Sequence, residues 1–209
     1  MKLRGLYAIT PDIPDRSKLT DLVYEALDGG IAALQYRCKS LEPWVRLGEA
    51  KAFALLCRGR GIPFIVNDDL DFSIAAGADG VHLGRNDGDL AAARSKLRGK
   101  LLGASCYDSL AAARAAVAAG ADYVAFGSVY ASRTKPGAVR APLALFREAR
   151  GLGVPLVAIG GIDADNAAAV IRAGADAIAV IAALFDAPDI AARARMLARL
   201  FNYRESSPP

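Results

Sequence analysis

Charged and polar side chains follow a short apolar run near the N-terminus, a pattern suited to binding an anion. The run forms a predicted strand over residues 32–37, and the chain reads Gln35-Tyr-Arg37-Cys-Lys39 across the end of this strand. Because side chains two apart in a strand point the same way, Gln35, Arg37 and Lys39 are expected to share one face. Two cations at the end of a buried strand are costly unless a negative group meets them. The segment therefore predicts an anion-binding site; ion pairing with neighbouring acids, or a solvated Lys39, is the alternative.

Carboxylates follow the next two apolar runs. Pro63–Asn67 is followed by Asp68 and Asp69, and Gly80–Gly84 is followed three residues later by Asp87. Neighbouring strands lie about 4.8 Å apart, so Asp68 and Asp87 can reach one hard cation. Mg²⁺ typically takes one or two carboxylates together with phosphate oxygens. Beside the basic cluster, the pair predicts a magnesium and pyrophosphate site, although one of the two consecutive Asp residues can instead cap a helix.

The remaining run ends supply hydroxyls, cations and exposed backbone. Ser105 ends the fifth run, and the segment 128–137 after the sixth is rich in hydroxyls and cations, as an ordinary surface loop can also be. Gly160-Gly161 ends the seventh run and allows the backbone to approach a ligand, unless it is simply a tight turn. Backbone N–H groups after the seventh and eighth runs, at Gly161 and Ile181-Ala182, suit the recurrent phosphate site of β/α barrels.

The single histidine and the three cysteines do not form a catalytic or metal-binding pattern. His82 lies inside an apolar run, and we interpret it as a packed, hydrogen-bonded residue rather than a catalytic one. Cys38, Cys57 and Cys106 are scattered and make no metal-ligand spacing with it. Cys38 and Cys106 follow strand ends but have no local basic partner that would produce a thiolate.

The elements that must position these residues repeat along the chain. The stretch Ala-Gly-Ala-Asp occurs at 76–79, 119–122 and 173–176, each time before an apolar run. Each copy predicts a helix end, a glycine turn and a strand buried on both faces. Eight strands are expected in all: Leu6–Thr10, Ala32–Arg37, Pro63–Asn67, Gly80–Gly84, Leu101–Ser105, Tyr123–Gly127, Pro155–Gly160 and Ala177–Ala182. Ala-rich segments with helical spacing lie between them.

This alternation predicts an α/β fold, a single (β/α)₈ TIM barrel over residues 1–209, with the site at the carboxyl ends of the strands. A doubly wound open sheet is the alternative, but it usually has fewer strands. We expect the tail 205–209 to be frayed.

Composition limits the class of protein. The chain has 209 residues, 54% hydrophobic and 23% charged, with a net charge of +4, which suits one globular domain. It has no long Lys/Arg run and no apolar run near the ~18 residues that span a bilayer, so neither nucleic acid nor a membrane is expected as a partner. The start Met1-Lys-Leu-Arg4 lacks the apolar core of a signal peptide. With the odd, scattered cysteines, this predicts a reduced cytoplasmic location.

In order and spacing, these run ends resemble the thiamine phosphate synthase family. The resemblance extends from Leu6 to about Ile190. Its motifs are Leu34-Gln-Tyr-Arg-Cys-Lys39, Ile65-Val-Asn-Asp-Asp69, Gly77-Ala-Asp-Gly-Val-His-Leu-Gly84, Leu102-Gly-Ala-Ser105, Phe126-Gly to Thr134-Lys-Pro136 and Ala158-Ile-Gly-Gly-Ile162. It implies a (β/α)₈ transferase that joins hydroxymethylpyrimidine diphosphate to a thiazole phosphate, releasing pyrophosphate and thiamine phosphate.

The resemblance also implies a role for individual residues. Those expected at the diphosphate substrate are Gln35, Arg37, Lys39, Asn67, Ser105 and Lys135. Of these, Arg37, Lys39, Ser105 and Lys135 are expected to act in catalysis, and Asp68 and Asp87 to bind Mg²⁺. The groups expected at the thiazole phosphate are Ser132, Thr134, Gly161 and the backbone of Ile181 and Ala182.

Three positions depart from the family pattern. Cys38 replaces a polar residue and is expected to point away from the cluster, while Ser132 replaces Thr and keeps the hydroxyl. Ala182 stands where Ser is common, so only its N–H remains for a phosphate.

Two other functions compete with the synthase. The related thiazole tautomerase resembles an enzyme that uses a His shortly after the fifth strand, where this chain reads Ser105-Cys-Tyr107-Asp108. A non-catalytic phosphate-binding barrel would not need the Asp68 and Asp87 pair. The family chemistry, loss of diphosphate to form a carbocation that the thiazole nitrogen traps, needs charge stabilisation and positioning rather than a general base.

Overall fold

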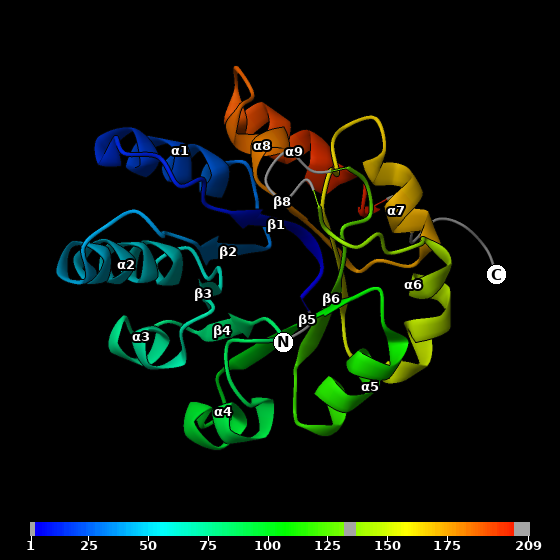
Figure 1. Cartoon of the computed structure of the whole chain (residues 1–209). Coiled ribbons are helices and arrows are strands. Elements are labelled where there is room, and N and C mark those ends of the chain that lie inside the picture. Colours follow the sequence, from blue (N-terminus) through cyan, green and yellow to red (C-terminus); the bar gives the residue numbers. More distant parts are fainter. Residues whose placement is uncertain (1–2, 132–136, 203–209) are drawn as a thin grey trace.

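Eight parallel strands form a closed barrel in chain order, with β1 pairing with β2 on one side and with β8 on the other (Figure 1). The computed structural model describes residues 3–131 and 137–202. The strands are β1 Gly5–Ile9, β2 Ala33–Tyr36, β3 Phe64–Asn67, β4 Gly80–Leu83, β5 Leu101–Tyr107, β6 Tyr123–Phe126, β7 Leu156–Ile159 and β8 Ala177–Val180. The prediction of a (β/α)₈ barrel is confirmed.

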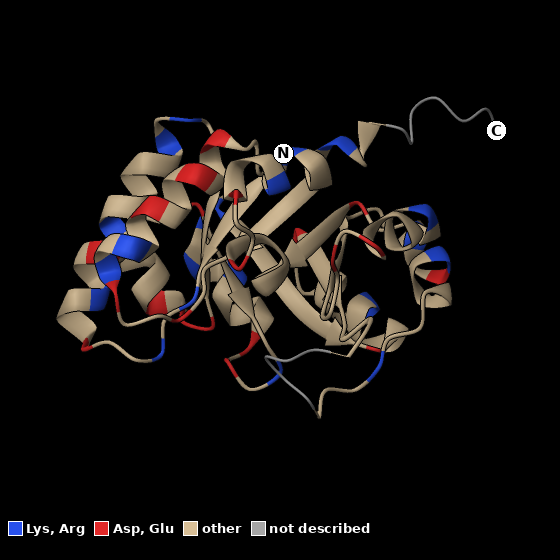
Figure 2. Cartoon of the chain, turned by 90° about the horizontal axis from the view of Figure 1, so that it is seen from above, with Lys and Arg blue, Asp and Glu red and all other residues tan. Residues whose placement is uncertain are grey.

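Helices follow every strand and surround the barrel (Figure 1). They are α1 Arg16–Asp28, α2 Pro43–Arg58, α3 Leu70–Ala75, α4 Leu90–Leu97, α5 Leu110–Ala118, α6 Ala144–Glu148 with the 3₁₀ turn η1 Ala149–Leu152, α7 Ala167–Ala173, α8 Ala182–Phe185 and α9 Ile190–Arg199. Basic and acidic residues are interspersed along the outer helices (Figure 2). Within the described ranges, no helix is both long enough and apolar enough to cross a bilayer.

The strands are buried on both faces, which explains their continuous apolar runs. One face of each strand points into the barrel, where Tyr7, Ile9, Tyr123 and Val157 belong to one packed cluster. The opposite face packs against the helices in a second, larger cluster that includes Leu6. The interior of the barrel is therefore a filled core, as is usual for this fold.

The three Ala-Gly-Ala-Asp stretches have one structural task at the amino ends of the strands. Their glycines, Gly77, Gly120 and Gly174, all have positive φ and end a helix, as predicted. Each Asp side chain accepts a hydrogen bond from a backbone N–H near the start of the preceding strand: Asp79 from Phe64 (2.9 Å), Asp122 from Leu102 (2.7 Å) and Asp176 from Leu156 (3.0 Å). The repeat joins neighbouring strands at the end of the barrel opposite the expected site.

Candidate active site

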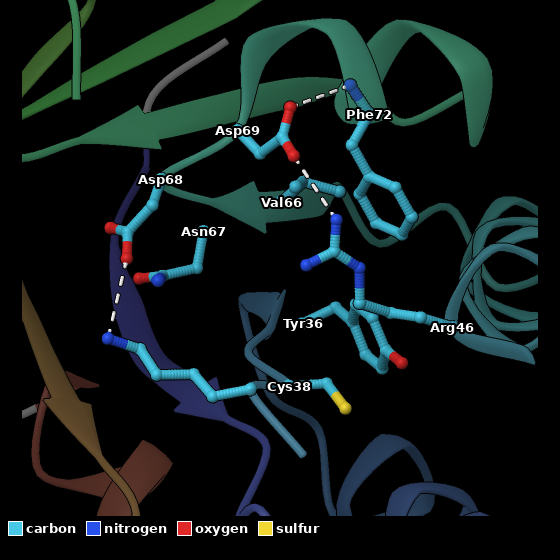
Figure 3. A pocket seen from close by; sticks show the side chains of 9 residues that line it. Tyr36, Cys38, Arg46, Val66, Asn67, Asp68, Asp69 and Phe72 are labelled. Carbon is cyan, nitrogen blue, oxygen red and sulfur yellow. Dashed lines mark hydrogen bonds and ion pairs between the residues drawn. The ribbon is translucent and has the colours of Figure 1, made fainter. Parts of the chain in front are cut away.

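A pocket of about 330 Å³ opens beside the carboxyl ends of β2 and β3 (Figure 3). Its polar lining consists of Lys39, Arg46, Asn67, Asp68 and Asp69, and Tyr36, Cys38, Val66 and Phe72 complete it. The pocket therefore lies at the end of the barrel where the sequence predicts the site. Cys38 is buried in the larger apolar cluster between the strands and the helices, and it also contributes to the lining of this pocket.

Asp68 and Asp69 have separate tasks. Asp69 caps α3, because its Oδ1 accepts from the Phe72 N–H at 2.9 Å and its Oδ2 accepts from Arg46 at 3.1 Å (Figure 3). Asp68 has a left-handed backbone conformation with φ 67° and pairs with Lys39 at 4.0 Å between Oδ2 and Nζ. Asp69 is therefore the helix cap that was expected of one of the two, which leaves the Asp68 carboxylate for the site.

Asp68 and Asp87 approach each other, as their places after neighbouring strands predict. Burial raises the pKa of Asp68 above its usual value, and the nearby Asp87 carboxyl raises it further against the opposing effect of Lys39. Asp87 is itself held by the Gly84 N–H, which donates to its Oδ2 at 2.7 Å. A divalent cation between two such carboxylates would relieve their repulsion, so the donor set fits Mg²⁺. The described residues contain no group of three or more His, Cys, Asp and Glu side chains able to hold a metal.

The basic segment after β2 is positioned by the loop after β1. Thr10 is fully buried, and its hydroxyl accepts from the Arg37 N–H at 2.9 Å and contacts the Arg37 carbonyl at 3.1 Å. The Asp12 carboxylate accepts from the Lys39 N–H at 2.9 Å and the Ser40 hydroxyl at 2.6 Å. Although burial opposes it, these hydrogen bonds lower the pKa of Asp12. Sequence reasoning missed Thr10 and Asp12, for which the only signal was their place directly after the first strand.

Of Gln35, Arg37 and Lys39, only Gln35 lies within strand β2. Strand β2 ends at Tyr36, one residue before the predicted end. The alternation of side chains along a strand therefore applies to Gln35 but not to Lys39. Gln35 is buried inside the barrel, where its Nε2 donates to the Tyr7 hydroxyl at 2.9 Å. The expectation that Gln35, Arg37 and Lys39 form one strand face is therefore wrong for Lys39, whose backbone Asp12 holds instead.

Ser105 and His82 meet at the ends of neighbouring strands. The Ser105 hydroxyl lies 2.8 Å from His82 Nε2, and His82 Nδ1 lies 3.1 Å from the Tyr123 hydroxyl. His82 is 8% exposed and stacks on the Tyr123 ring, with centroids 5.6 Å apart. The interpretation of His82 as a packed, hydrogen-bonded residue is confirmed.

The glycines after β7 make room for the loop after β6. Gly160 and Gly161 have φ of 101° and 61°. A Cβ on Gly160 would lie 2.1 Å from the Ser128 hydroxyl oxygen, and one on Gly161 would lie 2.3 Å from the Ala131 carbonyl oxygen. The structure thus gives these glycines a packing reason, and close approach to a ligand at Gly161 stays a prediction.

The remaining predicted residues surround the same end of the barrel or fall outside the description. Ile181 and Ala182 are partly exposed at the start of the short helix α8, directly after β8. Ser132, Thr134 and Lys135 lie outside the described residues, as does the tail 205–209.

Fold and site together define a (β/α)₈-barrel protein with a carboxylate pair and basic side chains at the carboxyl ends of its strands. The family model described as Thiamine monophosphate synthase matches residues 6–184. The chain is 58% identical to a thiamine-phosphate synthase of Aromatoleum aromaticum over 96% of this chain and 98% of that protein. It is 57% identical to one of Chromobacterium violaceum over 97% and 99%.

A solved structure gives the same result. The thiamine phosphate pyrophosphorylase from Pyrococcus furiosus superposes with a TM-score of 0.87 at 34% identity, covering 97% of both chains. The chain belongs to the thiamine monophosphate synthase family.

Proposed function

We propose that this chain is a magnesium-dependent thiamine-phosphate synthase that joins hydroxymethylpyrimidine diphosphate to thiazole phosphate, releasing pyrophosphate. The observation that supports it best is the Asp68 and Asp87 pair, in which burial and mutual proximity raise the pKa of Asp68 beside the Lys39 ammonium. Paired carboxylates facing cations suit a diphosphate bound through a divalent ion. The names of the relatives, thiamine-phosphate synthases at 58% and 57% identity, support the same reaction.

In this proposal Asp68 and Asp87 hold Mg²⁺, and Arg37 and Lys39 contact the diphosphate. The ion would neutralise charge on the departing diphosphate when bound. Lys39 would exchange its 4.0 Å pairing with Asp68 for the phosphate oxygens, and a side chain that is 59% exposed can make this movement at little cost. The Thr10 and Asp12 contacts hold the Arg37–Lys39 backbone in place while the side chains reach the ligand.

The other substrate contacts are assigned to residues around the same opening. Gln35, Asn67 and Ser105 would contact the diphosphate substrate, and Lys135 would add a cation. Ser132, Thr134, Gly161 and the backbone of Ile181 and Ala182 would hold the thiazole phosphate. The attacking thiazole nitrogen carries a free lone pair, so the protein's work is to orient the two substrates and stabilise the charge that develops on the leaving group.

We also place the reaction in the cytoplasm. All three cysteines, Cys38, Cys57 and Cys106, are free and buried. Burial raises the pKa of the Cys57 and Cys106 thiols to about 12, so both are unreactive thiols at neutral pH. Free thiols of this kind suit a reducing compartment.

The test supplies purified protein with both phosphorylated heterocycles and Mg²⁺ and measures thiamine phosphate and pyrophosphate. We expect both products in equal amounts, none in excess chelator, and recovery when Mg²⁺ is restored. Asp68→Ala and Asp87→Ala should lower turnover strongly, whereas Asp71→Ala, on the exposed outer side of α3, should not.

Two results would reject the proposal. Isomerisation of the thiazole phosphate without condensation would indicate the tautomerase. Binding of either phosphate compound without any product would indicate a non-catalytic phosphate-binding barrel. Full activity in excess chelator would reject the metal dependence alone.

A further inference from the structure

A continuous chain of hydrogen bonds crosses the barrel interior and ends at Ser105. Gln35 Nε2 lies 2.9 Å from the Tyr7 hydroxyl, which lies 2.9 Å from the Tyr123 hydroxyl. Tyr123 lies 3.1 Å from His82 Nδ1, and His82 Nε2 lies 2.8 Å from Ser105 Oγ. The five residues come from β2, β1, β6, β4 and β5, so the chain exists only when the barrel is closed.

Gly103 makes the central link possible. It pairs with His82 on one side and with Tyr123 on the other, so it lies between the two side chains. A Cβ on Gly103 would lie 2.3 Å from the Tyr123 hydroxyl oxygen and 2.6 Å from His82 Nδ1. Any larger residue would therefore occupy the space through which this hydrogen bond passes.

The chemistry of the first residue sets the direction of the chain. The Gln35 Nε2 group can only donate, so the Tyr7 oxygen accepts from it. The Tyr7 proton is then directed to Tyr123, the other hydrogen-bond partner that the described structure gives it. In the opposite arrangement, Tyr123 would donate to Tyr7, and the buried Tyr7 proton would have no acceptor in the described part of the chain, which costs more than a hydrogen bond contributes.

The rest of the chain follows from that first step. Tyr123 donates to His82 Nδ1, so the neutral imidazole carries its proton on Nε2. His82 Nε2 donates to Ser105 Oγ, and the Ser105 proton is free to point elsewhere. Both tyrosines are fully buried, and burial raises the pKa of each, so both hydroxyls keep the proton that they must donate.

We propose that this directed chain makes Ser105 a hydrogen-bond donor to the bound ligand, with His82 and Tyr123 as positioning residues that fix its orientation. Ser105 is partly exposed in the carboxyl-terminal half of β5, two residues before the strand ends at Tyr107. A donor at this point suits an oxygen that gains negative charge, as on a departing diphosphate, and this part of the inference rests on the proposed function.

The single histidine makes the direction of the chain directly measurable. In protein labelled with ¹⁵N-histidine, long-range ¹H–¹⁵N spectra distinguish the protonated ring nitrogen from the unprotonated one, and all signals come from His82. We expect the Nε2-protonated tautomer alone. The Nδ1-protonated tautomer, or a mixture of the two, would overturn the proposal, because the chain would then run the other way or have no direction.

Two variants test the link to the tyrosines. Tyr123→Phe removes the group that donates to His82 Nδ1 and should produce a mixture of tautomers. In Tyr7→Phe, the Tyr123 hydroxyl still has His82 Nδ1 as its acceptor, so the Nε2-protonated tautomer should persist. Tyr24→Phe removes the same hydroxyl from the exposed face of α1 and should leave the His82 spectrum unchanged. A pure Nε2-protonated tautomer in folded Tyr123→Phe, or loss of that tautomer in Tyr7→Phe, would overturn the assigned role of the chain.

Kinetics test the effect on the ligand separately. Ser105→Ala should lower kcat/KM for the diphosphate substrate roughly tenfold to a hundredfold, as expected for a lost hydrogen bond to a charged group. Tyr123→Phe should lower it by a smaller factor, and the double variant should be no worse than Ser105→Ala alone. Multiplied effects would show that Tyr123 does not act through Ser105. If the wild-type protein makes no thiamine phosphate, the proposed function is rejected. The tautomer spectrum then still tests the direction of the hydrogen-bond chain, because it does not depend on activity.

Discussion

Removal of the Asp79 carboxylate should destabilise the barrel without affecting its chemistry. Asp79→Ala removes the oxygen that accepts the Phe64 N–H at 2.9 Å, and Phe64 is fully buried at the start of β3. A lost hydrogen bond to a charged acceptor, with a buried donor left unpaired, costs about 1.5–3 kcal/mol. For a domain of this size each kcal/mol corresponds to roughly 2–4 °C, so Tm should fall by about 3–12 °C.

The repeat supplies internal comparisons for this prediction. Asp122→Ala should cost at least as much, because Asp122 also pairs with Arg94 at 2.5 Å. Asp79→Asn keeps an acceptor oxygen and should lose about half as much stability. Asp71→Ala removes an exposed Asp whose pair with Lys96 is long, at 3.4 Å, and should change stability by less than about 0.5 kcal/mol.

Thermal unfolding followed by circular dichroism measures these differences, and steady-state kinetics well below Tm measures activity. Asp79 precedes β4 at the amino end of the strand, away from the site, so kcat and KM should match the wild type. A wild-type Tm for Asp79→Ala would refute the role assigned to the repeat. A loss of kcat in the folded variant would refute the separation of stability from function.

Four further predictions concern the site. Mg²⁺ should raise the Tm of the wild type but not of Asp68→Ala or Asp87→Ala, and equal shifts in all three would place the ion elsewhere. The raised pKa of Asp68 means that its ionised form is disfavoured in the folded protein, so its contribution to stability is lost as the pH rises through that pKa. Asp68→Asn should therefore raise the Tm of the metal-free protein at pH 7. As the pH is lowered, the Mg²⁺ affinity of the wild type should begin to fall at a higher pH than it would with a carboxylate of ordinary pKa. Arg37→Ala should weaken binding of the diphosphate and Thr134→Ala that of the thiazole phosphate, each by about 1.5–3 kcal/mol, and a loss of pyrimidine affinity alone in Thr134→Ala would contradict the assignment. Lys135→Ala should lower kcat more than it raises KM for the diphosphate, with only partial recovery in Lys135→Arg, whereas an unchanged kcat would make Lys135 a solvated loop residue.

The sequence by itself determined the barrel and the neighbourhood of the site. Buried parallel strands need continuous apolar runs, so all eight strands could be located, with ends that differ from the structure by up to two residues. Chain order then places the ends of β3 and β4 side by side, which is why Asp68 and Asp87 could be paired from their positions alone.

Only the tertiary structure decided how the site is supported. Which of Asp68 and Asp69 caps α3 depends on local backbone angles that either residue type can adopt. Asp12 holds Lys39 from 27 residues away, and the link from Tyr7 to Tyr123 joins residues 116 apart. Such contacts join segments that meet only in the folded barrel, and no local pattern of residues records which of them will meet.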